Sequence, residues 1–169
     1  MKARILLLAS LLLVCLHAPQ IPGQQPPLAG STIGASLRNA ATATYNQLAA
    51  LRITVDNWSR RANAGIYTDA YFRQDYANTQ SQFVALRTQF NYLAEFALQL
   101  GRPRADNAVA ELDAGLNIIV ELFVFLEEQY NAGTLDRLTV VRTTQVFQKA
   151  IREWEHELRR NGSRMGLIW

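Results

Sequence analysis

Hydrophobic side chains between residues 72 and 100 recur at alternating gaps of four and three residues. This is the spacing of a heptad repeat, and it places one continuous apolar stripe along one side of an α-helix. The stripe consists of Phe72, Tyr76, Thr79, Phe83, Leu86, Phe90, Leu93, Ala97 and Leu100. A helix of about 30 residues is about 45 Å long and cannot bury such a stripe alone. It therefore needs partner helices of similar length.

Three other segments of the chain carry the same spacing. We expect helices over 33–64, 69–100, 104–130 and 136–160. Thr68 or Asp69 is the expected N-cap of the second helix, and Thr134 or Asp136 that of the fourth. Asn161-Gly162-Ser163 has the composition of a helix stop. We therefore expect residues 161–169 to form a C-terminal tail.

Four long amphipathic helices with short connections predict an all-α fold, an antiparallel up-down-up-down four-helix bundle over 33–160. The heptad-like spacing predicts left-handed packing with crossing angles of roughly +20°. No segment alternates between apolar and polar residues with a period of two, so we expect no sheet. A single helical hairpin that dimerises into a larger coiled coil is the structural alternative.

Charged residues predict how the second and third helices pair. The third helix has several acidic side chains, while the second has arginines at the equivalent flanking positions. Folding one helix back on the other places Arg87 near Asp113 and Arg73 near Glu127. Exposed pairs of this kind contribute up to about 1 kcal/mol each, so they select the register more than they hold the fold.

The N-terminus has the pattern of a secretory signal. Lys2 and Arg4 precede an apolar run of 12 residues over 5–16, which is too short to span a bilayer as a stable anchor. We expect a signal peptide over 1–23 and a linker rich in Pro and Gln over 24–32. The chain is then exported, to the periplasm or the extracellular space.

Cys15 is the only cysteine, so the chain cannot form an intramolecular disulfide. Leu12-Leu13-Val14-Cys15 resembles a bacterial lipobox, except that Val14 stands where that motif has a small residue. On one interpretation Cys15 is lipidated and anchors the protein to a membrane. On the other it is one more apolar residue of a signal that is removed.

The charge balance does not favour a nucleic-acid partner. Without the signal peptide the chain has 15 basic and 14 acidic residues, which lowers its formal net charge from +3 to +1. A nucleic-acid-binding domain would carry a marked basic surplus. We therefore expect no nucleic-acid binding, and contact with a membrane only if Cys15 is lipidated.

The sequence offers little that points to catalysis. Glu153 and His156 resemble the Glu-x-x-His motif of ferritin-like di-iron proteins, but that family needs the motif twice. Trp154 lies on the stripe, which directs Glu153 and His156 outward. There is no Cys-x-x-Cys-His, no Gly-x-Ser-x-Gly and no phosphate-binding loop. We expect no enzymatic activity, no metal and no cofactor.

The third helix carries more apolar residues than its stripe requires. Ile118, Val124 and Phe125 map to outer positions, and Leu122 maps to a flank. Ile118 and Phe125 are seven residues apart, so they form a second apolar face on the helix. We interpret this face as a candidate contact surface for a protein partner or another copy of the chain. The alternative is that this helix sits deeper in an irregular bundle.

These observations favour an exported, non-enzymatic bundle that acts through protein–protein contact. A second hypothesis is a sensor or binding bundle that holds a small apolar molecule among its inward aromatic side chains. A third is a periplasmic chaperone-like protein. Over 138–142 the chain is similar to the Leu-Thr-x-x-Gln motif of helical envelope-stress chaperones, with Arg142 in place of the glutamine.

Overall fold

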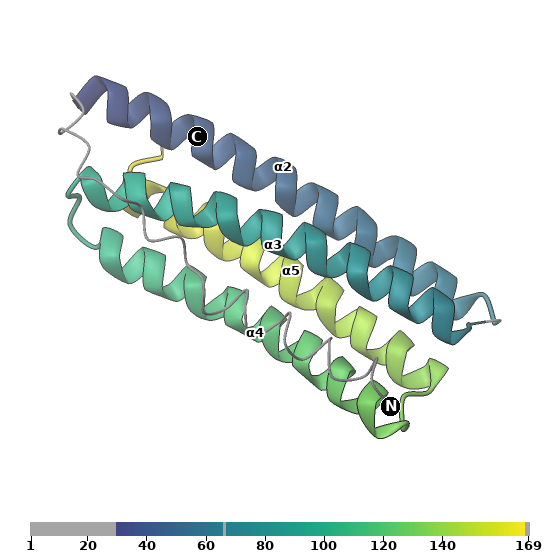
Figure 1. Ribbon diagram of the computed structural model, residues 1–169. Helices are drawn as coiled ribbons and strands as arrows, with labels where there is room; N and C mark the ends of the chain where they lie inside the picture. Colours follow the sequence, from purple (N-terminus) through teal and green to yellow (C-terminus); the bar gives the residue numbers. More distant parts are fainter. Residues whose placement is uncertain (1–29, 66, 168–169) are drawn as a thin grey trace.

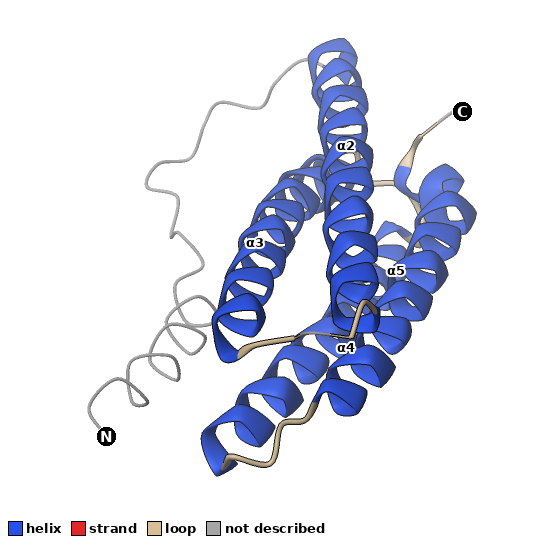
Figure 2. Ribbon diagram, turned by 90° about the vertical axis from the view of Figure 1, so that its right-hand side faces the viewer, coloured by secondary structure: helices blue, strands red, loops and turns tan. Residues whose placement is uncertain are grey.

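The computed structural model describes residues 30–65 and 67–167 of the chain. These residues form four long α-helices and no β-strand (Figure 1). The helices are α2 (Gly30–Asn63), α3 (Asp69–Gln99), α4 (Ala105–Ala132) and α5 (Arg137–Met165). They lie side by side as a four-helix bundle and are joined by short loops (Figure 2). The prediction of an all-helical, four-helix fold is therefore confirmed.

Side-chain caps and glycines define the ends of the helices. Thr68 is the N-cap of α3, and its side chain accepts a hydrogen bond from the backbone N–H of Tyr71 at 3.3 Å. Asp136 caps α5 in the same way, accepting from the backbone N–H of Thr139 at 2.6 Å. Gly133 follows α4 with a φ of 72°, a left-handed conformation that glycine adopts at little cost.

The fourth helix is longer than the sequence predicted. We expected it to end before residue 161 and to leave a tail over 161–169, but α5 continues to Met165. The four-three spacing continues through Asn161 and Met165, and both side chains are fully buried. Asn161 donates a hydrogen bond to Glu111 of α4 at 3.1 Å, which satisfies its buried amide. The helix ends instead at Gly166, with a φ of 96°.

Four aromatic rings in the core, one from each helix, contact one another in a closed circuit. Trp58 of α2 lies 6.5 Å from Tyr76 of α3, between ring centroids. Tyr76 lies 5.6 Å from Phe123 of α4, and Phe123 lies 4.9 Å from Phe147 of α5. Phe147 completes the circuit at 6.1 Å from Trp58. Such pairs contribute about 0.5–1.5 kcal/mol each beyond the area they bury, so this cluster ties all four helices together.

The helices are not evenly spaced. α2 packs closely against α3 and α5, and α4 packs closely against α5, whereas α3 and α4 approach each other less. Large side chains fill the wider space between α3 and α4. The rings of Phe72 and Tyr130 stack there with centroids 5.0 Å apart, and Phe83 lies 5.6 Å from Phe123.

Of the two ion pairs predicted between α3 and α4, one forms. Arg87 lies 3.1 Å from Asp113, as expected. The predicted pair of Arg73 with Glu127 is wrong, because Arg73 contacts Asp69 one helical turn away at 2.9 Å. Asp69 is more than half exposed, so Arg73 pairs with it without leaving solvent, whereas Glu127 is buried.

The close packing of α4 on α5 depends on a glycine. The Trp154 indole N–H donates a hydrogen bond to the backbone carbonyl of Leu112 at 2.8 Å, which lays the ring across α4. A Cβ atom on Gly115 would lie 2.7 Å from Trp154 Cδ1, closer than two carbon atoms can approach. Position 115 therefore has room only for glycine.

Replacing Gly115 with alanine should destabilise the bundle, although alanine is the better helix former by about 1 kcal/mol. The added methyl group must push Trp154 or the helix away, and we expect a net loss of about 1–3 kcal/mol in the free energy of unfolding, measured by urea denaturation. Gly34→Ala is the matched control, because its nearest neighbour is the end of the Arg38 side chain at 3.8 Å. The control should stabilise the protein, and equal effects of both substitutions would contradict this account.

Candidate functional site

The outer side of α4 presents three large apolar side chains to solvent. Ile118 is 52% exposed, Phe125 41% and Val124 37%. On the opposite side of the same segment, the stripe residues are buried to 1% exposure or less: Leu116, Ile119, Phe123 and Leu126. We call Ile118, Val124 and Phe125 the α4 face. Its position follows from the heptad spacing, which leaves these residues on the side that faces away from the core.

Leu122 differs from the other three candidate contact residues. It is half-buried and packs against the core, so it borders the α4 face instead of forming part of it. Leu122 lies seven residues after Gly115 and therefore on the same side of α4, the side that Trp154 of α5 covers. The sequence placed Leu122 on a flank, and the structure shows that α5 covers this flank closely enough to half-bury it.

Exposed apolar residues also lie on the neighbouring helix α5, and they were not predicted from the sequence. Leu138 is 49% exposed and Val146 is 47% exposed. Val146 holds the same heptad position in α5 that Ile118 and Phe125 hold in α4, directly before a buried stripe residue. That shared position is the signal that could have revealed it.

Charges are divided between these two helices. α4 contains six acidic side chains and no basic one: Asp106, Glu111, Asp113, Glu121, Glu127 and Glu128. α5 contains seven basic side chains against three glutamates: Arg137, Arg142, Lys149, Arg152, Arg159, Arg160 and Arg164. Glu121 and Glu128 are exposed beside the α4 face, and Arg142 and Lys149 are exposed beside Val146. The apolar residues are thus bordered by acidic groups on one helix and basic groups on the next.

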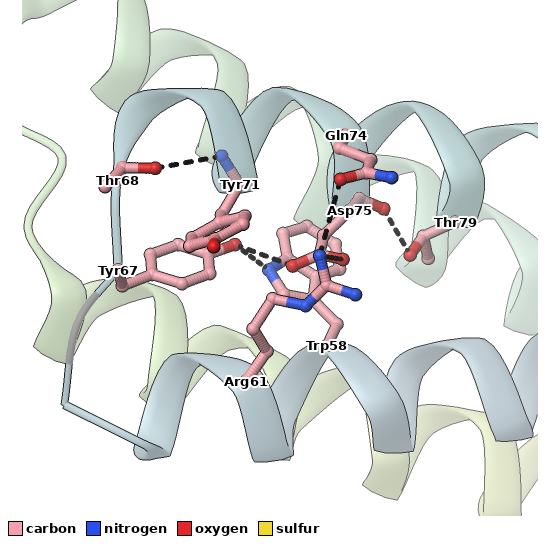
Figure 3. A network of polar contacts seen from close by, with 8 residues as sticks. All are labelled: Trp58, Arg61, Tyr67, Thr68, Tyr71, Gln74, Asp75 and Thr79. Carbon is pink, nitrogen blue, oxygen red and sulfur yellow. Dashed lines mark hydrogen bonds and ion pairs between the residues drawn. The ribbon is translucent and has the colours of Figure 1, made fainter.

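A buried polar network joins the ends of α2 and α3 (Figure 3). The Asp75 carboxylate lies 3.5 Å from the guanidinium of Arg61 and accepts a hydrogen bond from the Tyr67 hydroxyl at 3.3 Å. Tyr67 in turn accepts a hydrogen bond from the indole N–H of Trp58. Burial raises the pKa of Asp75, and both Arg61 and Tyr67 act against that shift. This network was not predicted from the sequence, although Arg61 and Asp75 both directly precede a stripe residue.

A second buried carboxyl group lies between α3 and α4. Glu127 is 4% exposed, and its Oε2 is 3.3 Å from the hydroxyl of Tyr76. Burial raises the pKa of Glu127, while the hydrogen bond from Tyr76 opposes the rise. Burial and the nearby carboxylate also raise the pKa of Tyr76. Oε2 therefore has one hydroxyl partner, while Oε1 is buried without a hydrogen-bond partner, and no ion pair to Glu127 forms among the described residues.

Both buried carboxyl groups are engaged by neighbouring side chains. Asp75 contacts an arginine and a tyrosine, and Glu127 contacts a tyrosine and is enclosed by the core. Among the described residues, no group of three or more His, Cys, Asp or Glu side chains could hold a metal ion. Trp154 is buried while Glu153 and His156 are exposed, which confirms the orientation predicted for that motif.

Two surface hollows lie near these networks. One, of about 240 Å³, is at the end of the bundle beside Tyr67, Phe72 and Tyr130. The other, of about 260 Å³, is between α2 and α3 beside Arg61 and Asp75 and is lined mostly by polar side chains. Both are smaller than the cavities of about 300–1,000 Å³ that usually hold small molecules. They do not favour the hypothesis of a bundle that binds an apolar ligand.

The fold and this site define a class, an all-α four-helix bundle with an exposed apolar face. No protein-family model, curated protein or solved structure matches the chain. None of the described helices is long and apolar enough to cross a membrane. The predicted signal peptide over 1–23, with Cys15, lies outside the described residues, as does most of the linker over 24–32.

The buried carboxyl groups should make the protein more stable in mild acid than at neutral pH. The pKa of Glu127 is higher in the folded state than in the unfolded chain. As the pH rises past the pKa that Glu127 has in the unfolded chain, the unfolded chain loses this proton before the folded protein does. The free energy of unfolding therefore falls with pH until the pH exceeds the pKa of Glu127 in the folded state. Glu127→Gln should flatten this dependence and raise the free energy of unfolding at pH 7.5 by about 1–2 kcal/mol.

Urea denaturation at a series of pH values between about 4 and 8 measures this effect. Glu128→Gln is the control, since Glu128 is the next residue along the chain and is exposed. The control should leave the pH profile unchanged. A steeper profile for Glu127→Gln, or the same profile for both variants, would show that Glu127 is not the group responsible.

Proposed function

We propose that this chain is an exported, non-enzymatic four-helix bundle that acts through protein–protein contact at the α4 face. The observation that carries the proposal is the exposure of Ile118, Val124 and Phe125 on a helix whose opposite side is fully buried. Fully burying an isoleucine or phenylalanine side chain contributes about 1.5–3 kcal/mol relative to leaving it in water. A partner that covers the α4 face would gain that free energy, which favours a contact role for the face.

The polar chemistry of the bundle supports a role without catalysis. Asp75 and Glu127 are buried carboxyl groups with raised pKa values, which is often a sign of an active site. Here each is engaged by neighbouring side chains inside the bundle, and each sits beside groups that hold the helices together. They are better explained as structural groups that fix how α2, α3 and α4 pair.

We also propose the antiparallel, up-down-up-down arrangement that the short loops predict. Tyr76 of α3 contacts Glu127 of α4, and Arg87 of α3 contacts Asp113 of α4. As residue numbers rise along α3 they fall along α4, which is the pattern of neighbours that run in opposite directions. The four-three spacing of the stripes favours left-handed packing of the helices.

The proposal of export rests on the sequence over 1–23. A basic start, a short apolar run and a segment rich in Pro and Gln are typical of a secreted or periplasmic protein. A lipid on Cys15 would hold the bundle at a membrane surface, through the residues that precede α2. In either case the α4 face would meet its partner outside the cytoplasm.

Photo-crosslinking in cells that produce the full chain tests the contact role. Benzoylphenylalanine at position 125 should form adducts with a protein, because Phe125 lies at the centre of the proposed contact. The control position is Tyr92, an aromatic side chain of α3 that is similarly exposed at 45%. Adducts are identified by mass spectrometry, and the partner found is either another protein or a second copy of the chain.

Ile118→Asp should lower the adduct yield at position 125 at least several-fold, since it places a charge in the contact. The double variant Ile118→Asp with Phe125→Asp should keep the helical content seen by circular dichroism, as both side chains lie outside the core. An equal yield at positions 92 and 125, or no protein adduct at 125, would overturn the proposal. Unfolding of the double variant would show that these residues belong to the core.

A further inference from the structure

We propose that the partner of the α4 face is a second copy of this chain, packed so that α4 of each copy lies over α5 of the other. This inference rests on the proposed function, because it names the partner of the same face. It is carried by the charges and exposed apolar residues that α4 and α5 present on their outer sides. Two identical surfaces meet in such a dimer, so the surface must complement itself.

The apolar residues of the two helices lie close to one another. Gly115 of α4 and Trp154 of α5 lie at the same level, because a Cβ atom on Gly115 would be 2.7 Å from Trp154 Cδ1. From this pair toward the connecting loop, Phe125 is ten residues along α4 and Val146 is eight residues along α5, so the two lie within about 3 Å of the same level. Phe125 and Val146 hold the same heptad position on neighbouring helices, so together they form one apolar strip. In the proposed dimer, Phe125 of one copy covers Val146 of the other.

The charges complement one another at the same levels. Glu121 and Glu128 follow the outermost side of α4, seven residues apart, and both are exposed. Arg142 and Lys149 follow the outermost side of α5, also seven residues apart, and both are exposed. By the same correspondence Glu121 lies level with Lys149, and Glu128 lies level with Arg142. Lys149 is 71% exposed even though Glu153 is 3.6 Å away, so it is accessible to a second carboxylate.

These charges select one of two symmetric arrangements. A two-fold axis parallel to the helices places α4 of one copy over α5 of the other, so that acidic groups meet basic groups. A two-fold axis across the helices places α4 over α4, so that Glu121 and Glu128 meet the same residues of the other copy. Like charges that face each other across an interface repel, so the first arrangement is favoured.

The outer surface of α4 and α5 is large enough for a stable dimer. α4 has 28 residues and α5 has 29, which makes each about 42 Å long. Two helices side by side, each about 10 Å wide, present roughly 800 Å² on one side. That is about the area that each partner buries in an interface of standard size.

Charge reversal on one helix at a time tests the arrangement. The wild-type bundle should dimerise at micromolar concentration, measured by sedimentation equilibrium. The acid-reversed variant, Glu121→Lys with Glu128→Lys, and the base-reversed variant, Arg142→Glu with Lys149→Glu, should each weaken dimerisation by about 100-fold or more. An equimolar mixture of the two variants should restore a 1:1 heterodimer, because each reversed helix then meets a helix of opposite charge.

The control is Arg38→Glu with Arg60→Glu, which changes the net charge as much as the base-reversed variant does but lies on α2. It should dimerise like the wild type. A monomeric wild type, reversals that dimerise normally, or a mixture that stays monomeric would each overturn the dimer. If the wild type is monomeric while position 125 crosslinks to a different protein, the dimer is wrong and the contact role stands. If position 125 also forms no protein adduct, both proposals fail.

Discussion

The circuit of Trp58, Tyr76, Phe123 and Phe147 is the contact on which the rest of the structure depends. Each helix carries an apolar stripe that is too long to be covered by one neighbour. The four rings belong to these stripes, one to each helix, and they contact one another in the core. Removing a ring from this circuit breaks its contacts with rings of two other helices and leaves a cavity in the core, and such cavities are costly. Aromatic side chains also reach across the wider space between α3 and α4, which shorter side chains would leave unfilled.

Buried polar groups inside the bundle lower its stability but fix the register in which the helices pack. Asp75, Glu127 and Asn161 are buried, and each finds a partner on another segment of the chain. A buried charge contributes little net stability, yet it strongly disfavours any packing in which its partner is missing. A bundle held only by apolar stripes could slide by one heptad with little penalty. These three contacts each fit one register, so together they discriminate against the alternatives.

The four-three spacing was enough to predict the four helices and the residues that each buries, because burial in a bundle depends mainly on heptad position. It failed where a distant residue decides the outcome. Asn161-Gly162-Ser163 looks like a helix stop, but Glu111 supplies the partner that lets Asn161 stay buried in the helix. The pairing of Arg73 failed for the opposite reason, because a local partner, Asp69, lies one helical turn away and is more accessible than the buried Glu127.

The candidate face was only partly visible in the sequence, for a related reason. A second apolar row on one helix can be counted from residue positions alone, and Ile118 and Phe125 were found in this way. Val146 was not predicted, although the expected bundle already makes its helix a neighbour of α4, because it is a single exposed apolar residue at its heptad position and forms no second row along α5. Leu122 changed its role because its burial depends on how closely α5 covers the flank on which it lies.

The division of charge among the helices affects how the bundle is oriented when it approaches a charged surface. α4 carries only acidic side chains, whereas α2 carries four arginines and one aspartate, and α5 is also basic overall. These charges give the bundle an electric dipole component directed across its width, between α4 on one side and α2 and α5 on the other. An approaching charged surface would turn the molecule before touching it, presenting α4 to a positive surface and the α2 and α5 side to a negative one. At high ionic strength this orienting torque disappears, and encounters become random in direction.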